Sequence, residues 1–288
     1  MSTRSLRLGQ VVLTVALGAA VGTSVIAAPG GAAKPAAPAK PAAAAKAAPV
    51  NVPAEAARLV GADASAAADA AKALGRSGDP AAHDALLDAL ATGVAPEVAA
   101  AALGALAAHP APPDAAMLVL YAGHRNDQVR AAAVGALGAY PDPQARKAAV
   151  AALGDDEQAV RDAAANAVAT GKIREGVDRL MALLDRGDSA APPALAALAD
   201  ADMAHAIGEH LGTAPAPVLA LTLGKILRRA DFPEPARVQV VRTLAKVPGA
   251  EATTALTDYV EATPEKPPRQ SRKEAEAVVE ARISGGGQ

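Results

Sequence analysis

The chain has 288 residues, enough for one elongated repeat domain or two small ones, and 51% of them are hydrophobic although only 1% are aromatic. Alanine, leucine and valine supply most of the apolar content, which favours thin, closely packed helices and disfavours a β-sandwich. The net charge is −2, and the absence of cysteine excludes disulfides, thiolate metal sites and a cysteine nucleophile. Residues 1–50 carry five basic side chains and no acidic one, so the remainder holds 23 basic against 30 acidic residues, which argues against a nucleic-acid groove.

Residues 1–27 have the layout of a bacterial secretory signal. Arg4 and Arg7 precede an uncharged, apolar stretch at 11–28 that ends in small residues, and cleavage is expected after Ala27. The mature protein would then be periplasmic or secreted. The alternative is an uncleaved anchor formed by residues 11–28, which are near the lower length limit for crossing a bilayer. Contact with a membrane is expected only in that case.

Residues 28–54 are expected to form a disordered linker. Proline, alanine and lysine alternate there without a hydrophobic face, so this segment cannot bury enough apolar surface to fold. Its role would be to hold the following domain away from a membrane or wall.

Residues 55–263 alternate helical runs with short breaks. Asp79-Pro80 and Asp142-Pro143 each place a capping aspartate before a proline at the first helical position. Glycines 75, 154, 171, 187 and 212 fall near expected helix ends, where a left-handed residue is favoured. The expected helix pairs are 64–75 with 80–91, 96–108 with 113–122, 127–139 with 143–153, 157–169 with 174–185, 190–199 with 202–211, and 235–247 with 251–262. A helix at 216–229 has no obvious partner in this scheme.

A 31-residue period connects the first helices of these pairs. Val129-Arg130 and Val160-Arg161 are separated by this interval, and Val98 lies the same distance before Val129. Each valine opens a run whose apolar residues recur at i, i+4, i+7 and i+8, which is one face of a helix. A single pair of such helices cannot close a core, so neighbouring pairs are expected to stack.

Residues 264–288 are expected to form a C-terminal capping helix and a disordered glycine tail. Ser271 and Glu274 have the spacing of a capping box and predict a final helix at 272–283. This helix would cover the exposed end of the stack.

The repeated pattern Asp-x-x-Val-Arg-x-Ala-Ala-x-x-Ala-Leu-Gly resembles the HEAT-like repeats, in particular the short type associated with phycobilisome lyases. Residues 126–130, 135–138 and 156–161 carry the pattern best, and the likeness is good over 60–190 and weak over 190–263. The resemblance implies an all-α fold, an α-solenoid of stacked antiparallel helix pairs. It also implies a structural ladder of aspartate and arginine along the stack, formed by Asp127, Arg130, Asp156 and Arg161.

No catalytic, cofactor-binding or metal-binding residues are expected. His205 and His210 are the only histidines close together, but they are five positions apart, so their side chains diverge by about 140° around a helix. A helical zinc pair needs two histidines on one face, usually four apart. The lyase association of the repeat does not extend to this chain, since no bilin-handling residues match.

These features favour a non-catalytic protein–protein interaction scaffold or adaptor of the bacterial cell envelope. Its partner would be a protein or peptide, and not a nucleic acid. The second helices of the pairs are expected to form a concave binding surface, with Asp84, Asp88, Arg146, Lys147, Asp178 and Arg179 as candidate contacts. The alternative is a lyase-like or metal-assisted accessory enzyme with an unrecognised site, because the fold does not set the function.

Overall fold

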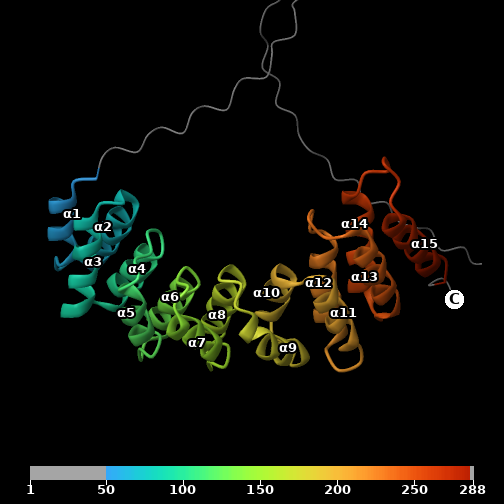
Figure 1. The fold of residues 1–288 in the computed structure, drawn as a ribbon, viewed down its shortest axis with the longest axis horizontal. Helices are drawn as coiled ribbons and strands as arrows, with labels where there is room; N and C mark the ends of the chain where they lie inside the picture. Colours follow the sequence, from blue (N-terminus) through green and yellow to red (C-terminus); the bar gives the residue numbers. More distant parts are fainter. Residues whose placement is uncertain (1–49, 286–288) are drawn as a thin grey trace, which may run out of the picture. The chain divides into compact units, whose positions relative to one another are not determined.

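The computed structural model describes residues 50–285, which form fifteen α-helices and no strand (Figure 1). The helices are α1 (Val52–Leu59), α2 (Ala64–Ser77), α3 (Pro80–Thr92), α4 (Pro96–Leu106), α5 (Asp114–Tyr121), α6 (Asp127–Leu137), α7 (Pro143–Ala152), α8 (Gln158–Thr170), α9 (Val177–Asp185), α10 (Ala191–Leu198), α11 (Ala201–Glu209), α12 (Ala216–Leu227), α13 (Glu234–Lys246), α14 (Ala250–Ala262) and α15 (Gln270–Gly285). A short 3-10 turn, η1 (Arg174–Gly176), leads into α9. The expected signal segment and most of the expected linker lie outside the described residues.

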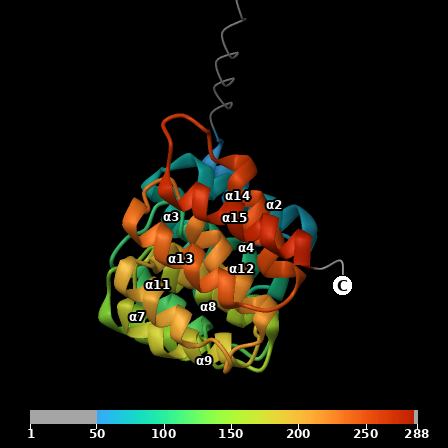
Figure 2. The ribbon, with the colours of Figure 1, turned by 90° about the vertical axis from the view of Figure 1, so that its right-hand side faces the viewer.

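The helices stack in two rows that follow the order of the chain. An inner row contains α2, α4, α6, α8, α10, α12 and α14, and an outer row contains α3, α5, α7, α9, α11, α13 and α15 (Figures 1 and 2). Each member of the inner row packs on the next from α2 to α14, whereas the outer row is packed less evenly. The structure confirms the predicted all-α solenoid of stacked antiparallel helices.

The row of helices that lies on the concave side of the stack is not the expected one. Within residues 50–285 the stack curves, and the inner row, which contains the Val-Arg helices α6 and α8, lies on its concave side (Figure 1). The expectation that the second helices line the concave side is therefore wrong. The closely packed inner helices leave the outer helices further apart, as in any curved double layer.

The helix pairing expected near the C-terminus is also corrected. The helix expected at 216–229 is α12, which belongs to the inner row between α10 and α14 and is followed by α13 in the outer row. The last pair is therefore α14 with α15, and the alternation of rows continues without a break. The sequence pattern weakens after residue 190, but the inner helices continue to stack in order.

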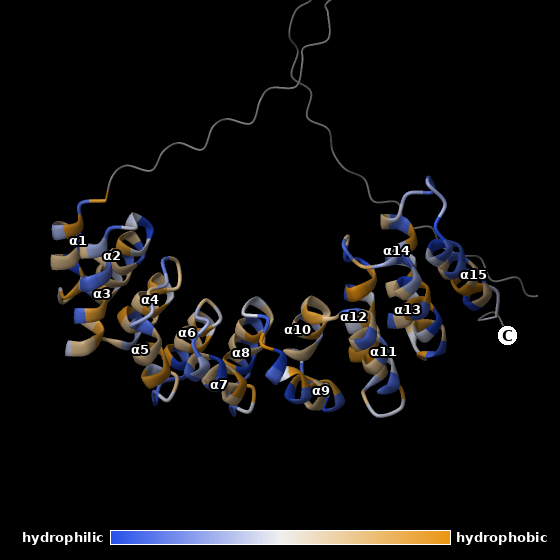
Figure 3. Cartoon of the chain, in the orientation of Figure 1, coloured by the Kyte–Doolittle hydropathy of each residue, from blue (hydrophilic) through white to orange (hydrophobic). Residues whose placement is uncertain are grey.

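The repeated valines lie in the core, as the period predicts. Val98, Val129 and Val160 are all buried, and so are Ala133 and Leu137 on the same face of α6. Most helices carry both hydrophobic and hydrophilic positions, as expected for helices packed on one side, whereas α10 contains only alanine, proline and leucine (Figure 3).

Very small residues let successive inner helices approach closely. Gly75 is buried within α2, where an added Cβ would lie 2.6 Å from the Cβ of Ala105 on α4. At the end of α6, a Cβ on Gly138 would lie 2.8 Å from the Cα of Ala167 on α8. Gly75 was expected at a left-handed helix end, but the left-handed residue after α2 is Gly78, with φ 64°.

The N-terminal end of the stack differs from the expected boundary. The linker was expected to reach residue 54, but α1 begins at Val52. The Asn51 side chain accepts a hydrogen bond from the Ala54 N–H, and Pro53 suits the first turn of a helix.

The C-terminal helix α15 packs against α13 and α14. It begins at Gln270, two residues before the expected start, so Ser271 lies inside the helix and the predicted capping box is wrong. The Ser271 hydroxyl donates to Glu234 at 2.8 Å, while Glu274 pairs with Arg242. Both side chains therefore connect α15 to α13 instead of capping their own helix.

No helix within residues 50–285 has the length and apolar character needed to cross a bilayer.

A pair of glycine substitutions tests the close approach of α2 and α4. We expect Gly75→Ala to lower the free energy of unfolding by about 1–3 kcal/mol, because the new methyl group overlaps Ala105. Gly104→Ala is the matched control: no atom lies within 4 Å of its added Cβ, so helix propensity should raise stability by about 0.5–1 kcal/mol. Chemical denaturation of both variants measures the difference, and equal effects would contradict the packing argument.

Candidate functional site

The two arginines of the Val-Arg pairs link adjacent repeats. The Arg130 guanidinium donates to both carboxylate oxygens of Asp155, at 3.0 and 2.9 Å. Arg161 donates to Asp188 at 2.7 Å, and each arginine also donates to backbone carbonyls just before its own helix. Each arginine thus links the loop that precedes its own helix to the corresponding loop of the next repeat.

The carboxylates of this ladder are not the expected ones. The sequence pattern indicated Asp127 and Asp156, but the structure brings Asp155 and Asp188 to the arginines instead. Asp156 contributes only its backbone carbonyl, which accepts from Arg161. Asp127 lies in the first turn of α6, where a carboxylate stabilises the positive end of the helix. The resemblance implied the arginines of the ladder but placed its carboxylates at the wrong positions.

The ladder carboxylates are held in their charged form. The hydrogen bond from Arg130 lowers the pKa of Asp155. For Asp188, burial opposes the shift, but hydrogen bonds from the Ala190 N–H, Gln158 and Arg161 together lower its pKa.

A buried polar cluster joins α3, α5 and the loop before α7, and the sequence analysis did not identify it. Asp114 is fully buried, and its carboxylate accepts from the Ala111 N–H, lies 2.8 Å from Nε2 of His83 and accepts from the Tyr140 hydroxyl at 3.0 Å. Burial, followed by the charge of Asp114, raises the pKa of Tyr140. His83 and Asp114 are 31 residues apart, so the repeat period was the signal that could have paired them.

The two histidines of α11 and its C-terminus point to different partners. His205 lies 3.6 Å from Glu209, whereas Nδ1 of His210 lies 2.6 Å from Asp185 of α9. Across the described part of the chain, no group of three or more histidine, aspartate or glutamate side chains is arranged to hold a metal ion.

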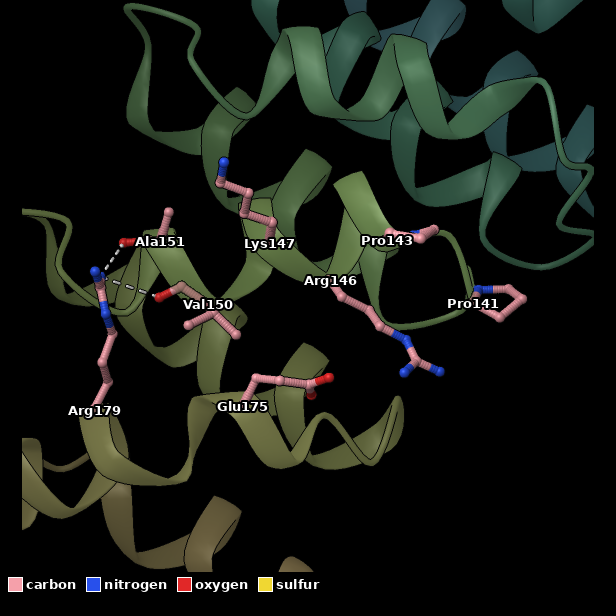
Figure 4. A pocket seen from close by; sticks show the side chains of 8 residues that line it. All are labelled: Pro141, Pro143, Arg146, Lys147, Val150, Ala151, Glu175 and Arg179. Carbon is pink, nitrogen blue, oxygen red and sulfur yellow. Dashed lines mark hydrogen bonds between the residues drawn. The ribbon is translucent and has the colours of Figure 1, made fainter.

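The strongest candidate site is a groove between α7 and α9 in the outer row (Figure 4). It has a volume of about 560 Å³ and crosses a repeat boundary. We call it the α7–α9 groove, and its lining is Pro141, Pro143, Arg146, Lys147, Val150, Ala151, Glu175 and Arg179. Three of the six side chains predicted to contact a partner are therefore brought together here.

The α7–α9 groove has three cations and one carboxylate. Arg179 donates to the carbonyls of Val150 and Ala151, both at 3.3 Å, and this fixes it against the end of α7. Arg146 and Lys147 extend in opposite directions from α7, and neither joins an ion pair within residues 50–285 (Figure 4). Glu175 supplies the only acidic side chain of the lining.

The other predicted contacts are exposed but separate from this groove. Asp84 and Asp88 lie on α3, and Asp84 borders a smaller cavity of about 250 Å³ together with His83 and His109. Asp178 is exposed on α9 beside Arg179 but does not line the groove. That all six residues contact one partner stays a prediction.

The two-row stack of antiparallel helices defines an α-solenoid with a groove on its outer side. Residues 115–203 match the family of HEAT repeats, so the chain contains HEAT-like repeats over this part. This match includes α7, η1 and α9, and thus every residue that lines the groove.

Several solved structures resemble the chain weakly. The complex of CpcE and CpcF of phycocyanin lyase from Nostoc sp. PCC7120 shares 19% identity over 85% of this chain and 99% of that one, with a TM-score of 0.45. Human deoxyhypusine hydroxylase shares 19% identity over 81% and 96% of the two chains, with a TM-score of 0.37. An engineered protein shares 22% identity over 82% of each chain, with a TM-score of 0.41. A search of curated proteins found no match.

Replacement of a ladder carboxylate should give a pH-dependent loss of stability. We expect Asp188→Asn to lower the free energy of unfolding by about 1.5–3 kcal/mol at neutral pH, because charge-assisted hydrogen bonds are lost. The pKa of Asp188 is lowered on folding, so its contribution is complete above its unfolded pKa of about 3.9 and is lost as the pH falls through the folded value. The gap between the wild type and the variant should therefore close in acid.

The matched control for this prediction is Asp156→Asn, since Asp156 is exposed and only its backbone takes part in the ladder. Urea titrations between neutral and acidic pH measure both variants. A larger loss for Asp156→Asn would make Asp156, and not Asp188, the carboxylate that stabilises the ladder.

Proposed function

We propose that this protein is a non-catalytic scaffold or adaptor that binds a protein segment in the α7–α9 groove. The observation that carries the proposal is the groove itself. On the outer side of the stack, it brings side chains of two successive repeats into one hollow that is charged and partly apolar. Such a combination of an apolar wall with a few polar anchors is typical of peptide and ligand sites.

The location of the groove suits a protein partner. A segment lying across α7 and α9 would contact two repeats at once, so its affinity would depend on their relative position. Exposed apolar atoms of Pro141, Pro143 and Val150 supply area to bury, and charged side chains at both ends supply orientation.

The proposed setting is the bacterial cell envelope. Its support is the sequence of residues 1–27, with two arginines, an apolar stretch and small residues before Ala28. The proline-, alanine- and lysine-rich segment that follows would separate the repeat domain from a surface. Fractionation of cells that express the full chain tests this setting, and recovery in the cytoplasm would overturn it.

Site-specific cross-linking tests the proposed binding role. A photo-reactive amino acid at Lys147 of the full chain should give one dominant protein adduct in cells, because this exposed side chain borders the groove. The same photo-reactive group at Asp69, an exposed position of α2 far along the stack, is the control. Mass spectrometry identifies the adducts, and identical adducts from both positions would contradict specific binding.

A further inference from the structure

We propose that the occupant of the α7–α9 groove is an acidic peptide segment, which places carboxylates on Arg146 and Lys147 and an apolar side chain against Val150 and Pro143. This inference rests on the proposed function and specifies the chemistry of the partner.

The first argument is uncompensated charge. Arg146 and Lys147 join no ion pair within the described chain, although acidic residues outnumber basic ones from residue 51 onward. Other arginines of the solenoid, such as Arg130, Arg161 and Arg242, face a carboxylate. Other cations, such as Arg76, Arg125 and Lys172, also lack an ion pair, but Arg146 and Lys147 lie together in the lining of one groove, which a carboxylate-bearing ligand would complement.

The second argument is the position of these cations on their helix. Arg146 and Lys147 are the fourth and fifth residues of α7, and its first turn contains no acidic side chain. Backbone N–H groups make that end of a helix positive, so cations there are disfavoured and carboxylates are favoured. The carboxylate of Asp142 already caps this end of α7, and the helix end itself does not favour the positive charges of Arg146 and Lys147.

The third argument is the shape and lining of the groove. Its volume of about 560 Å³ lies within the range of about 300–1,000 Å³ that is common for ligand sites. Two prolines, Val150 and Ala151 form its apolar part. The Arg179 guanidinium is already held by two carbonyl groups, so it needs little ordering to add a further contact.

A peptide fits this surface better than a membrane does. Glu175 lies inside the groove, and Asp178 is exposed next to it, so a flat anionic bilayer would meet both carboxylates together with the cations. A narrow peptide can place its acids beside Arg146 and Lys147 and avoid Glu175. Glu175 therefore restricts how an acidic segment can lie.

Peptide binding to the full-length protein tests this inference. The probe is a short fluorescein-labelled peptide in which glutamates flank two leucines, and its control replaces every glutamate with glutamine. We expect anisotropy to show binding of the acidic peptide at low salt, weaker binding at higher salt, and little binding of the glutamine peptide.

Charge-reversed variants connect this binding to the groove. The double variant Arg146→Glu with Lys147→Glu should weaken binding of the acidic peptide by about tenfold or more, because it replaces both cations that would hold the carboxylates; tenfold corresponds to about 1.4 kcal/mol. The matched control is Lys72→Glu with Arg76→Glu, an equal charge change on exposed positions of α2. Glu175→Gln should strengthen binding several-fold. The groove variant should unfold at a temperature no lower than the wild type, because acids suit the start of α7.

Three results would overturn the inference: equal binding of the glutamine peptide, equal loss in the α2 control, or no effect of Glu175→Gln. Binding of phosphatidylglycerol vesicles that is lost in the Arg146→Glu, Lys147→Glu variant, without binding of the acidic peptide, would also overturn the inference and assign the groove to a membrane instead. A specific cross-link from Lys147 with no acidic-peptide binding would retain the scaffold and reject only this partner chemistry.

Discussion

The close contact between successive inner-row helices is the constraint on which the rest of the structure depends. Gly75 against Ala105 and Gly138 against Ala167 leave no room for an added carbon atom. Helices that approach so closely on one side of a double layer must diverge on the other, which gives the stack its curvature (Figure 1). The α7–α9 groove lies on the diverging side, so the packing of small residues in one row creates the space for binding in the other.

Polar links supplement a core that buries little area per residue. Alanine offers few apolar atoms, and burial of apolar surface contributes only about 25 cal/mol per Å². The structure adds connections that span one repeat: His83 with Asp114, Tyr121 with the Leu90 carbonyl, and Arg228 with Asp258 are separated by 31, 31 and 30 residues. These links persist beyond residue 190, where the apolar pattern fades, so the stacking outlasts the sequence motif.

The sequence predicted what depends on local chemistry and on the period. Helix starts at Pro80 and Pro143 follow from a capping aspartate and a proline, and the burial of Val129 and Val160 follows from helical spacing. Partners in space were harder to predict. Asp155 rather than Asp156 meets Arg130 because of the conformation of one loop, and a shift of one residue there changes which side chain reaches the next repeat.

The concave side could not be assigned from the pattern either, because both rows alternate along the chain and only their relative packing decides which is inner. The strict repeat positions belong to the inner row and the loops, where close packing and the arginine links restrict the side chains. Outer positions such as Arg146 and Lys147 are free of both demands. Side chains that take no part in the close packing or in the arginine links can differ without loss of the stack, and this separates the part of the sequence that builds the solenoid from the part that we propose gives it a function.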